Sequence, residues 1–127
     1  MITKNAELGT HGESAACLFL ERKGYKIIDR NVRYPWGELD VVTQAPDGTL
    51  VFVEVKTMTE PPANARGSGL RPEDHMTGEK MEKFRRTASL YAGHRHELVR
   101  DDRGYRLDLV ALVRTAGGFA VRHYENV

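Results

Sequence analysis

The sequence predicts an α/β fold in which helices and strands follow the order α-β-β-β-α-β-β. Two segments, 5–23 and 78–94, have apolar residues at the three- and four-residue spacing of an amphipathic helix. Five shorter segments have the apolar and β-branched composition of strands, and turn residues lie between them. A chain of 127 residues has room for one domain, so a single domain over residues 1–127 is expected.

The first helix and the first strand are predicted from the pattern that precedes Pro35. The apolar residues of 5–23 fall on one side of a helix, and Gly24 is suited to the left-handed position that ends it. The strand predicted over 25–33 ends before Pro35, because a proline cannot donate to a strand ladder and restricts the residue before it.

A β-hairpin is the most specific local prediction. Strands are expected over 38–44 and 50–57, joined by a three-residue turn over 46–48. In this Pro-Asp-Gly turn the proline presets φ, and Gly48 accepts the left-handed conformation that closes the loop. The turn pairs Ala45 with Thr49, so residues across the ladder have numbers that sum to 94.

This register predicts which side chains share a face of the hairpin. Glu38 is placed opposite Lys56, and Asp40 is placed opposite Glu54, with all four on one face because side chains alternate along a strand. A slip of one residue would move these acids into the core, so the register is well specified. The other face forms a core surface of Leu39, Val41, Val53 and Val55.

The remaining elements follow a long connection over 58–77, which is rich in proline and glycine and has no periodicity. Loops of this length tend to be functional or disordered. After the second helix, a strand is predicted over 105–113, and its continuously apolar stretch 109–113 is typical of a strand covered on both faces. The segment 119–124 is expected to be an edge strand.

Composition excludes several classes of protein. With 40% hydrophobic and 29% charged residues, the chain has the composition of a folded domain. Its apolar runs are far shorter than the roughly 20 residues that span a bilayer, and residues 1–4 lack the apolar core of a secretory signal. Cys17 is the only cysteine, which excludes an internal disulfide. A cytoplasmic protein with no membrane partner is expected, and at a net charge of +1 any basic surface must be local.

The opposed acids indicate a chemical function. Two carboxylates with Cβ atoms about 5 Å apart repel by about 3 kcal/mol at an effective dielectric constant near 20. A shared proton, Lys56 or a bound cation would relieve this repulsion. A carboxylate pair with an open side suits Mg²⁺, and Lys56 could orient the water that attacks a phosphodiester. The alternative is a solvated sheet face, on which Glu38 and Lys56 form a surface ion pair worth under about 1 kcal/mol.

The hairpin also carries a family resemblance. The run Gly-Glu-Leu-Asp-Val-Val at 37–42, followed by Val-Phe-Val-Glu-Val-Lys-Thr at 51–57, resembles the PD-(D/E)xK nuclease motif. Upstream, 11–16 through 23–25 is similar to the opening of archaeal-type Holliday-junction resolvases. Over nearly its whole length the chain resembles the uncharacterised bacterial YraN-like family of the restriction-endonuclease-like superfamily, and Lys80 and 106–108 match later positions of that family.

The resemblance implies a restriction-endonuclease-like α/β fold, with an α-β-β-β-α-β core, a mixed central sheet and an extra C-terminal edge strand. It implies Asp40 and Glu54 as ligands of Mg²⁺ or Mn²⁺, Lys56 as the catalytic lysine, and Glu13 as a further catalytic acid and metal ligand from the first helix. The implied activity is that of a metal-dependent endonuclease on structured or branched DNA, working as a homodimer. Two alternatives stay open: an inactive nucleic-acid-binding module of the same fold, and a protein-interaction domain.

Glu13 and Trp36 each have a second interpretation. Thr10 and Glu13 have the spacing of a capping box, in which Glu13 would bond the Thr10 backbone N–H at the start of the helix. If the helix starts near Asn5 instead, Glu13 lies in its middle, above the sheet. Trp36 is suited either to stacking on a base or to half-buried packing against the hairpin.

Four basic residues are candidates for nucleic-acid binding. Lys80 and Lys83 on the second helix could contact phosphates, although nearby glutamates also fit a solvated face of mixed charge. Arg66 and Arg71 in the long connection could clamp a nucleic-acid strand or serve solubility. Asp108, at the start of a core strand, is expected to anchor a loop arginine.

Overall fold

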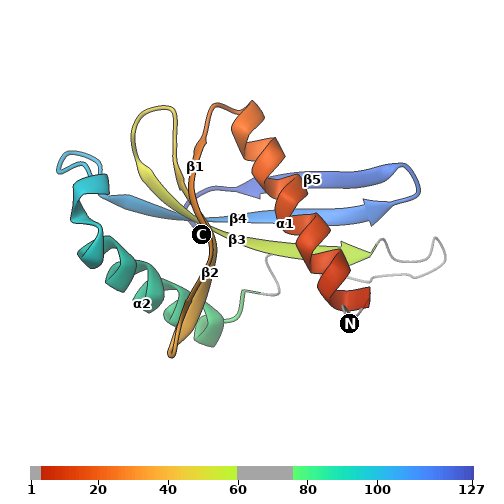
Figure 1. Ribbon diagram of the computed structural model, residues 1–127, viewed down its shortest axis with the longest axis horizontal. Coiled ribbons are helices and arrows are strands. Elements are labelled where there is room, and N and C mark those ends of the chain that lie inside the picture. Colours follow the sequence, from red (N-terminus) through yellow and green to blue (C-terminus); the bar gives the residue numbers. More distant parts are fainter. Residues whose placement is uncertain (1–3, 60–75) are drawn as a thin grey trace.

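The strands in the described part of the chain form one mixed sheet with the order β1-β2-β3-β4-β5. The computed structural model describes residues 4–59 and 76–127, with side chains in helix α1 described from Gly12 onward. Only the β3–β4 pair is parallel; the other neighbouring strands are antiparallel (Figure 1). The elements run α1 Lys4–Arg22, β1 Lys26–Tyr34, β2 Gly37–Gln44, β3 Leu50–Thr59, α2 Gly78–His94, the 3₁₀ helix η2 His96–Leu98, β4 Tyr105–Thr115 and β5 Gly118–Tyr124.

The predicted element order is confirmed, and so are the mixed sheet and the C-terminal edge strand. Element boundaries differ from the prediction by one or two residues, as helix and strand ends usually do. Helix α1 begins at Lys4, so Thr10 lies inside the helix and is no N-cap. The capping-box interpretation of Glu13 is therefore wrong, because a capping box needs its first residue at the helix start.

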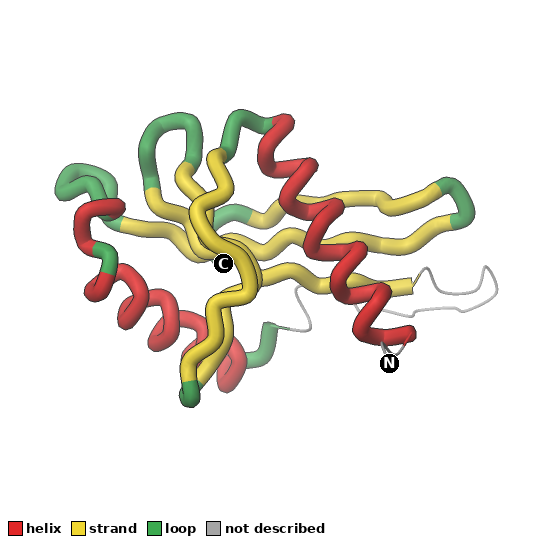
Figure 2. Tube along the Cα trace, in the orientation of Figure 1, coloured by secondary structure: helices red, strands yellow, loops and turns green. Residues whose placement is uncertain are grey.

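Two apolar layers hold the helices to opposite faces of the sheet (Figure 2). On one face, Ala16, Cys17 and Leu20 of α1 pack against alternate residues of β2, β3 and β4. On the other face, the predicted apolar stripe of α2 is buried with the intervening residues of β2 and β3; it consists of Met81, Phe84, Ala88 and Tyr91. The stretch 109–112 of β4 is fully buried, as expected for a strand covered on both sides.

The turn of the β2–β3 hairpin has the predicted conformation. The Ala45 N–H donates to the Thr49 carbonyl oxygen at 2.8 Å, and Gly48 has a φ of 90°. The pairs from Gln44–Leu50 to Val41–Val53 follow the predicted register. The turn chemistry therefore fixes the alignment of the two strands at this end of the hairpin.

The predicted ladder does not continue past the pair Val41–Val53. From that point β2 stays paired with β1 and bends away from β3 (Figure 1). The predicted pairs Asp40–Glu54 and Glu38–Lys56 are therefore not ladder pairs. Leu39 packs into the apolar layer beside α2, whereas Val41 and Val53 pack beside α1. The prediction that Leu39 shares their face was wrong, because the β2–β3 ladder from which it was made ends at Val41–Val53.

In the described part of the chain, no helix is long and apolar enough to cross a membrane.

Candidate functional site

A pocket of about 350 Å³ opens where β2 leaves β3, between the β1–β2 hairpin and the first half of α2. Its charged lining consists of acids from the strands, together with one lysine from β3 and two from α2. These residues are Glu38, Asp40, Glu54, Lys56, Lys80 and Lys83. The structure thus gathers the predicted acids of the hairpin, the predicted catalytic lysine and two predicted phosphate contacts around one cavity, although the acids and lysine are not opposed in a ladder.

Asp40 is held in the pocket by a backbone hydrogen bond. The Val55 N–H of β3 donates to Asp40 Oδ2 at 2.8 Å. This carboxylate accepts the hydrogen bond at the point where the β2–β3 ladder has ended. A backbone N–H bond to a carboxylate is charge-assisted and favours the ionised form. Asp40 is thereby fixed in orientation as well as in position.

Glu54 and Asp40 form a partly buried pair of carboxylates whose pKa values are both raised. Burial, and then the charge of Asp40, raises the pKa of Glu54 to about 7, although Lys56 opposes the shift. Lys56 Nζ lies 3.5 Å from Glu54 Oε1, and both side chains are about three-quarters buried, with exposures of 27% and 22%. Burial also raises the pKa of Asp40, while the Val55 N–H and a hydrogen bond with Glu54 lower it. Near neutral pH this pair therefore retains a proton that a cation could displace.

Glu13 lies close to the pair but not in the pocket wall. Helix α1 approaches β3 so closely that a Cβ added to Gly12 would overlap the Thr57 hydroxyl. Glu13 follows Gly12 in the middle of α1, so this close approach brings Glu13 near Asp40. Its pKa is raised by burial and then by Asp40, against a lowering by Asn31 and by Arg30 and Arg33. Glu13 is absent from the residues that line the pocket.

Asn31 is a residue of this site that the sequence reasoning missed. It has a φ of 51°, a left-handed conformation that asparagine adopts more easily than most residues. The β1–β2 pairing passes from Arg30–Val41 to Val32–Leu39 without a pair between Asn31 and Asp40. Asparagine is depleted in strands, so an asparagine between Arg30 and Val32 was the available signal. Strained backbone of this kind concentrates at functional sites.

The predicted nucleic-acid contacts divide into two groups. Lys80 and Lys83 line the pocket from α2, whose N-terminus is capped by the Thr77 side chain accepting from the Lys80 N–H at 3.3 Å. Arg66 and Arg71 lie outside the residues that the structure describes.

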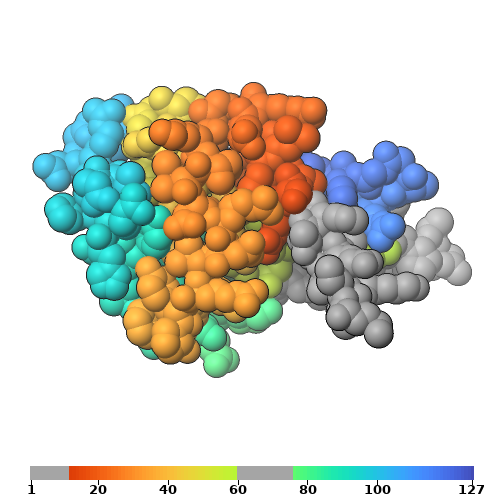
Figure 3. Space-filling view, viewed as in Figure 1, coloured from red at the N-terminus to blue at the C-terminus, as the bar shows by residue number. Residues whose placement is uncertain are grey.

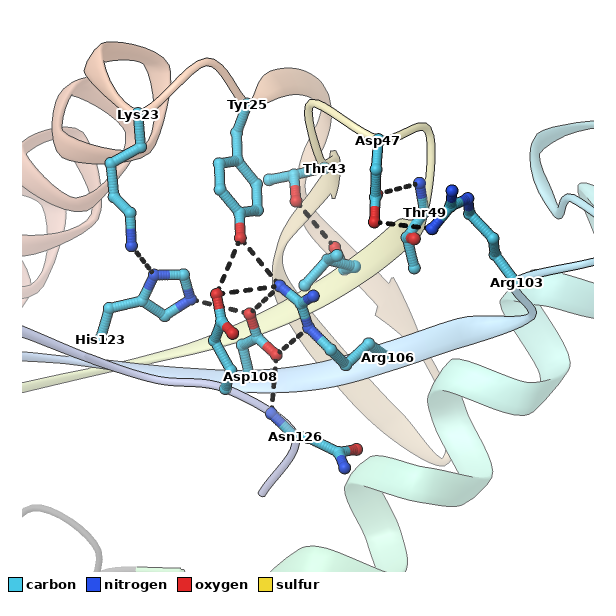
Figure 4. Close-up of polar contacts among 12 residues, drawn as sticks. Lys23, Tyr25, Thr43, Asp47, Thr49, Arg103, Arg106, Asp108, His123 and Asn126 are labelled. Atoms are coloured by element: carbon cyan, nitrogen blue, oxygen red, sulfur yellow. Dashed lines mark hydrogen bonds and ion pairs between the residues drawn. The ribbon is translucent and has the colours of Figure 1, made fainter.

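A second polar cluster surrounds Asp108, on the other side of the sheet from α2 (Figure 4). The Asp108 carboxylate is fully buried, and its oxygens accept from Arg106 at 2.8 and 2.9 Å and from the Asn126 N–H at 3.0 Å. His123 Nε2 lies 2.7 Å from the same carboxylate. Among the residues that the structure describes, the arginine that binds Asp108 is Arg106 of the same strand and not one from a loop.

This cluster also contains three side chains at metal-binding distance. One ligand atom each from Asp108, His123 and Glu125 lies within 4.8 Å of the others. However, the Asp108 oxygens already have donors from Arg106 and the backbone. Burial acts to raise the pKa of Asp108, but the hydrogen bonds from His123, Arg106 and Asn126 outweigh it and hold the pKa below its usual value. The negative charge of Asp108 is therefore compensated by its hydrogen-bond donors, whereas the Asp40–Glu54 pair has a raised pKa.

The fold and the site together define a class. A mixed five-stranded sheet between two helices, with acids and a lysine where the second strand leaves the third, is a restriction-endonuclease-like α/β arrangement.

The chain belongs to the uncharacterised protein family UPF0102, the YraN family, whose sequence model matches residues 12–112. A UPF0102 protein of Corynebacterium efficiens is 40% identical over 129 residues, covering 100% of this chain and 96% of the relative. One from Beutenbergia cavernae is 39% identical over 122 residues, covering 94% of each chain. One from Flavobacterium johnsoniae is 30% identical over 125 residues, covering 98% of this chain and 96% of the relative. The predicted resemblance to this family is confirmed.

Proposed function

We propose that the protein is a metal-dependent endonuclease that hydrolyses phosphodiester bonds in structured or branched DNA. The observation that carries the proposal is the partly buried acidic pair Asp40–Glu54, with Lys56 beside it, in a pocket that two further lysines line. The resemblance to Holliday-junction resolvases directs the choice of substrate, and it also supports a homodimer, which light scattering of the purified protein can test.

The residues of the pocket fit a hard divalent cation. Asp40 and Glu54 provide oxygen ligands, which Mg²⁺ and Mn²⁺ prefer, and few protein ligands are needed because Mg²⁺ keeps several waters. The raised pKa of Glu54, caused first by burial and then by the charge of Asp40, supports a site at which a cation would stabilise the ionised pair. Asp40 and Glu54 would hold the cation, with Glu13 nearby as a further acid. When bound, the cation supplies positive charge that stabilises the reacting phosphate and favours deprotonation of the attacking water.

The other residues have roles that follow from their positions. The Val55 N–H favours the ionised form of Asp40, against the effect of burial, and fixes its orientation. Lys56, close to Glu54, orients the attacking water and adds positive charge where charge builds up on the phosphate. Lys80 and Lys83 contact phosphates from the α2 side of the pocket. Together these groups place water and phosphate in one cavity between fixed charges.

The first test is a cleavage assay on a panel of DNA shapes: single strand, linear duplex, flap, fork and four-way junction, each with Mg²⁺ or Mn²⁺. Cleavage is expected in the native protein and should fall by about 100-fold or more in Lys56→Ala, since positioned charges and proton-transfer groups typically contribute that much. Lys26→Ala, which removes an exposed lysine at the start of β1, is the matched control and should cleave normally.

Two other results would replace this proposal. DNA binding without cleavage under either metal would indicate an inactive nucleic-acid-binding module. Failure to bind any DNA, even at low salt where phosphate contacts are strongest, would favour a protein-interaction domain.

A further inference from the structure

The tip of the β1–β2 hairpin carries two aromatic rings that lie against each other. The rings of Tyr34 and Trp36 are almost parallel, with 6° between their planes and 5.0 Å between their centroids. This geometry is an offset stack, one of the arrangements that aromatic pairs prefer. Tyr34 is partly buried, whereas Trp36 is 40% exposed, so Trp36 is the outer ring of the stack.

The fold holds this aromatic pair in place. Pro35 between the two residues restricts the backbone, because its ring fixes φ. Tyr34 packs against the apolar layer beside α2, and its ring centroid lies 6.4 Å from that of His94. Gly37 packs so closely on α2 that an added Cβ would overlap the Thr87 hydroxyl. A surface that is already ordered loses little entropy when a ligand binds to it.

The aromatic pair is continuous with the acidic pocket. Tyr34, Pro35 and Gly37 form part of the pocket wall, and Lys80 and Lys83 line the same wall from α2. The hairpin lies directly beside α2 on the molecular surface, where both are seen at the left of Figure 3. A DNA strand whose phosphates contact these lysines would therefore pass its bases along the hairpin tip. The lysines match the charge of the backbone, and the exposed ring matches the flat face of a base.

A base inside a duplex cannot stack on the exposed ring of Trp36. Inside a duplex both faces of a base are covered by its neighbours, so a base must leave the stack before a side chain can stack on it. In single strands, stacking of bases on aromatic side chains is a general and sequence-tolerant mode of binding.

We propose that the Tyr34–Trp36 pair binds an unpaired nucleobase of the DNA strand whose phosphodiester lies in the pocket. This inference rests on the proposed nuclease function and narrows its substrate. Flaps, forks and other DNA with a single-stranded segment at the pocket are preferred over a fully paired four-way junction. Trp36 is in this view a specificity-determining residue and takes no part in the chemistry.

Trp36 is the only tryptophan of the chain, so its fluorescence reports on this contact directly. The test uses the full-length chain with Asp40→Asn and no added divalent cation, which keeps the DNA intact. An oligothymidylate, a blunt duplex of the same length, and that duplex with a single-stranded tail are titrated separately. The oligothymidylate and the tailed duplex should quench the tryptophan emission, and the blunt duplex should leave it unchanged.

Substitutions measured by fluorescence anisotropy of labelled DNA complete the test. Trp36→Leu should weaken binding of the oligothymidylate by about tenfold, with little change for the blunt duplex. Trp36→Phe keeps an aromatic face and should restore most of the affinity. Tyr105→Leu is the matched control, because Tyr105 is 38% exposed and does not line the acidic pocket; it should bind like the parent chain. Melting temperatures confirm that each variant is folded.

The possible failures can be told apart. If DNA binds but Trp36→Leu weakens single-stranded and duplex DNA equally, or the oligothymidylate causes no quenching, the stacking inference is wrong while the nuclease proposal stands. If no DNA of any shape binds, the proposed function itself is wrong, and the exposed ring must serve another partner.

Discussion

Asp40 provides a hydrogen-bond acceptor at the point where two strands separate. Its carboxylate accepts the Val55 N–H at 2.8 Å just beyond the last β2–β3 ladder pair. The backbone donor is thus satisfied although the two strands separate, which avoids the cost of an unpaired N–H. The same bond keeps the carboxylate next to Glu54. The hydrogen bond from Val55 to Asp40 therefore serves both the backbone of β3 and the proposed metal site.

The raised pKa of Glu54 predicts that the stability of the protein depends on pH. Between pH 4.5 and about pH 7, the folded protein keeps a proton on Glu54 that the unfolded chain has lost. Because the folded state binds more protons there, the free energy of unfolding without metal should fall as pH rises through this window. The expected contribution is on the order of 3 kcal/mol. Urea unfolding at a series of pH values measures it.

Two variants isolate this contribution from that of other titrating groups. Glu54→Gln should lose the dependence, so its stability relative to the native protein should increase as pH rises from 4.5 to about 7. Glu38→Gln removes a well-exposed acid of the same hairpin, 63% exposed, and should follow the native curve. Parallel curves for the native protein and Glu54→Gln would mean that the pKa of Glu54 is not raised in the folded protein.

At the scale of elements, local chemistry predicted most of the fold. The Pro-Asp-Gly turn set the register from Val41 to Gln44, and the helical period identified the buried stripe of α2. Alternation failed at Asp40, because a period of two assumes that the ladder continues. The separation of β2 from β3 depends on packing between distant segments, such as Gly37 on Thr87 of α2. A strand pattern contains no signal for that contact.

The candidate site was predictable for a related reason, and only in part. Asp40 lies on one strand of the predicted hairpin, and Glu54 and Lys56 lie two residues apart on the other. Pairing of the two strands from the Pro-Asp-Gly turn therefore brings these side chains close together. The left-handed Asn31 and the aromatic pair were harder to predict. Their importance follows from the gap in the β1–β2 pairing at Asn31 and from the stacked geometry of the two rings. Neither can be deduced from residue type alone.

The crossing of α1 over β3 gives a prediction at this scale. A Cβ at Gly12 would overlap the Thr57 hydroxyl, so Gly12→Ala should push α1 away from β3. The expected cost is about 1–3 kcal/mol in the free energy of unfolding, the usual range for overpacking. DNA cleavage should also fall, because Glu13 follows Gly12 directly. Thermal and urea unfolding measure the first effect, and the cleavage assay measures the second.

A second glycine and a double variant serve as controls for this prediction. Gly93 lies in the last turn of α2, and a Cβ there would meet nothing within 4 Å, so Gly93→Ala should cost no stability and should stabilise the protein by at most about 1 kcal/mol. Adding Thr57→Ala to Gly12→Ala removes the overlapping hydroxyl and should recover part of the lost stability. If Gly12→Ala behaves like Gly93→Ala, the close approach of α1 to β3 is not present in solution.

At the scale of the whole molecule, the net charge does not reveal that the cluster around Asp108 and the Asp40–Glu54 pair differ in how well their charges are compensated. The chain carries 19 basic and 18 acidic residues, which suggests balance everywhere. Around Asp108 that balance is local, since Arg106 and the Asn126 N–H satisfy the buried carboxylate and tie the C-terminal residues to β4. Around Asp40 and Glu54 it is not, because burial and then the charge of Asp40 raise the pKa of Glu54 despite Lys56. Only the second cluster should gain stability from an added cation.

This difference can be measured as the thermal stability of the intact protein. Above pH 7, where Glu54 would release its proton, Mg²⁺ at about 100 times its dissociation constant should stabilise the native state by about 2.7 kcal/mol, which raises the melting temperature by roughly 10 °C. NaCl at equal ionic strength is the control for screening. Asp40→Asn should abolish the shift, whereas Glu125→Gln, which alters the cluster around Asp108, should retain it. The reverse pattern, with the shift lost in Glu125→Gln and kept in Asp40→Asn, would place the cation at Asp108 and His123 and remove the basis for nuclease chemistry in the pocket.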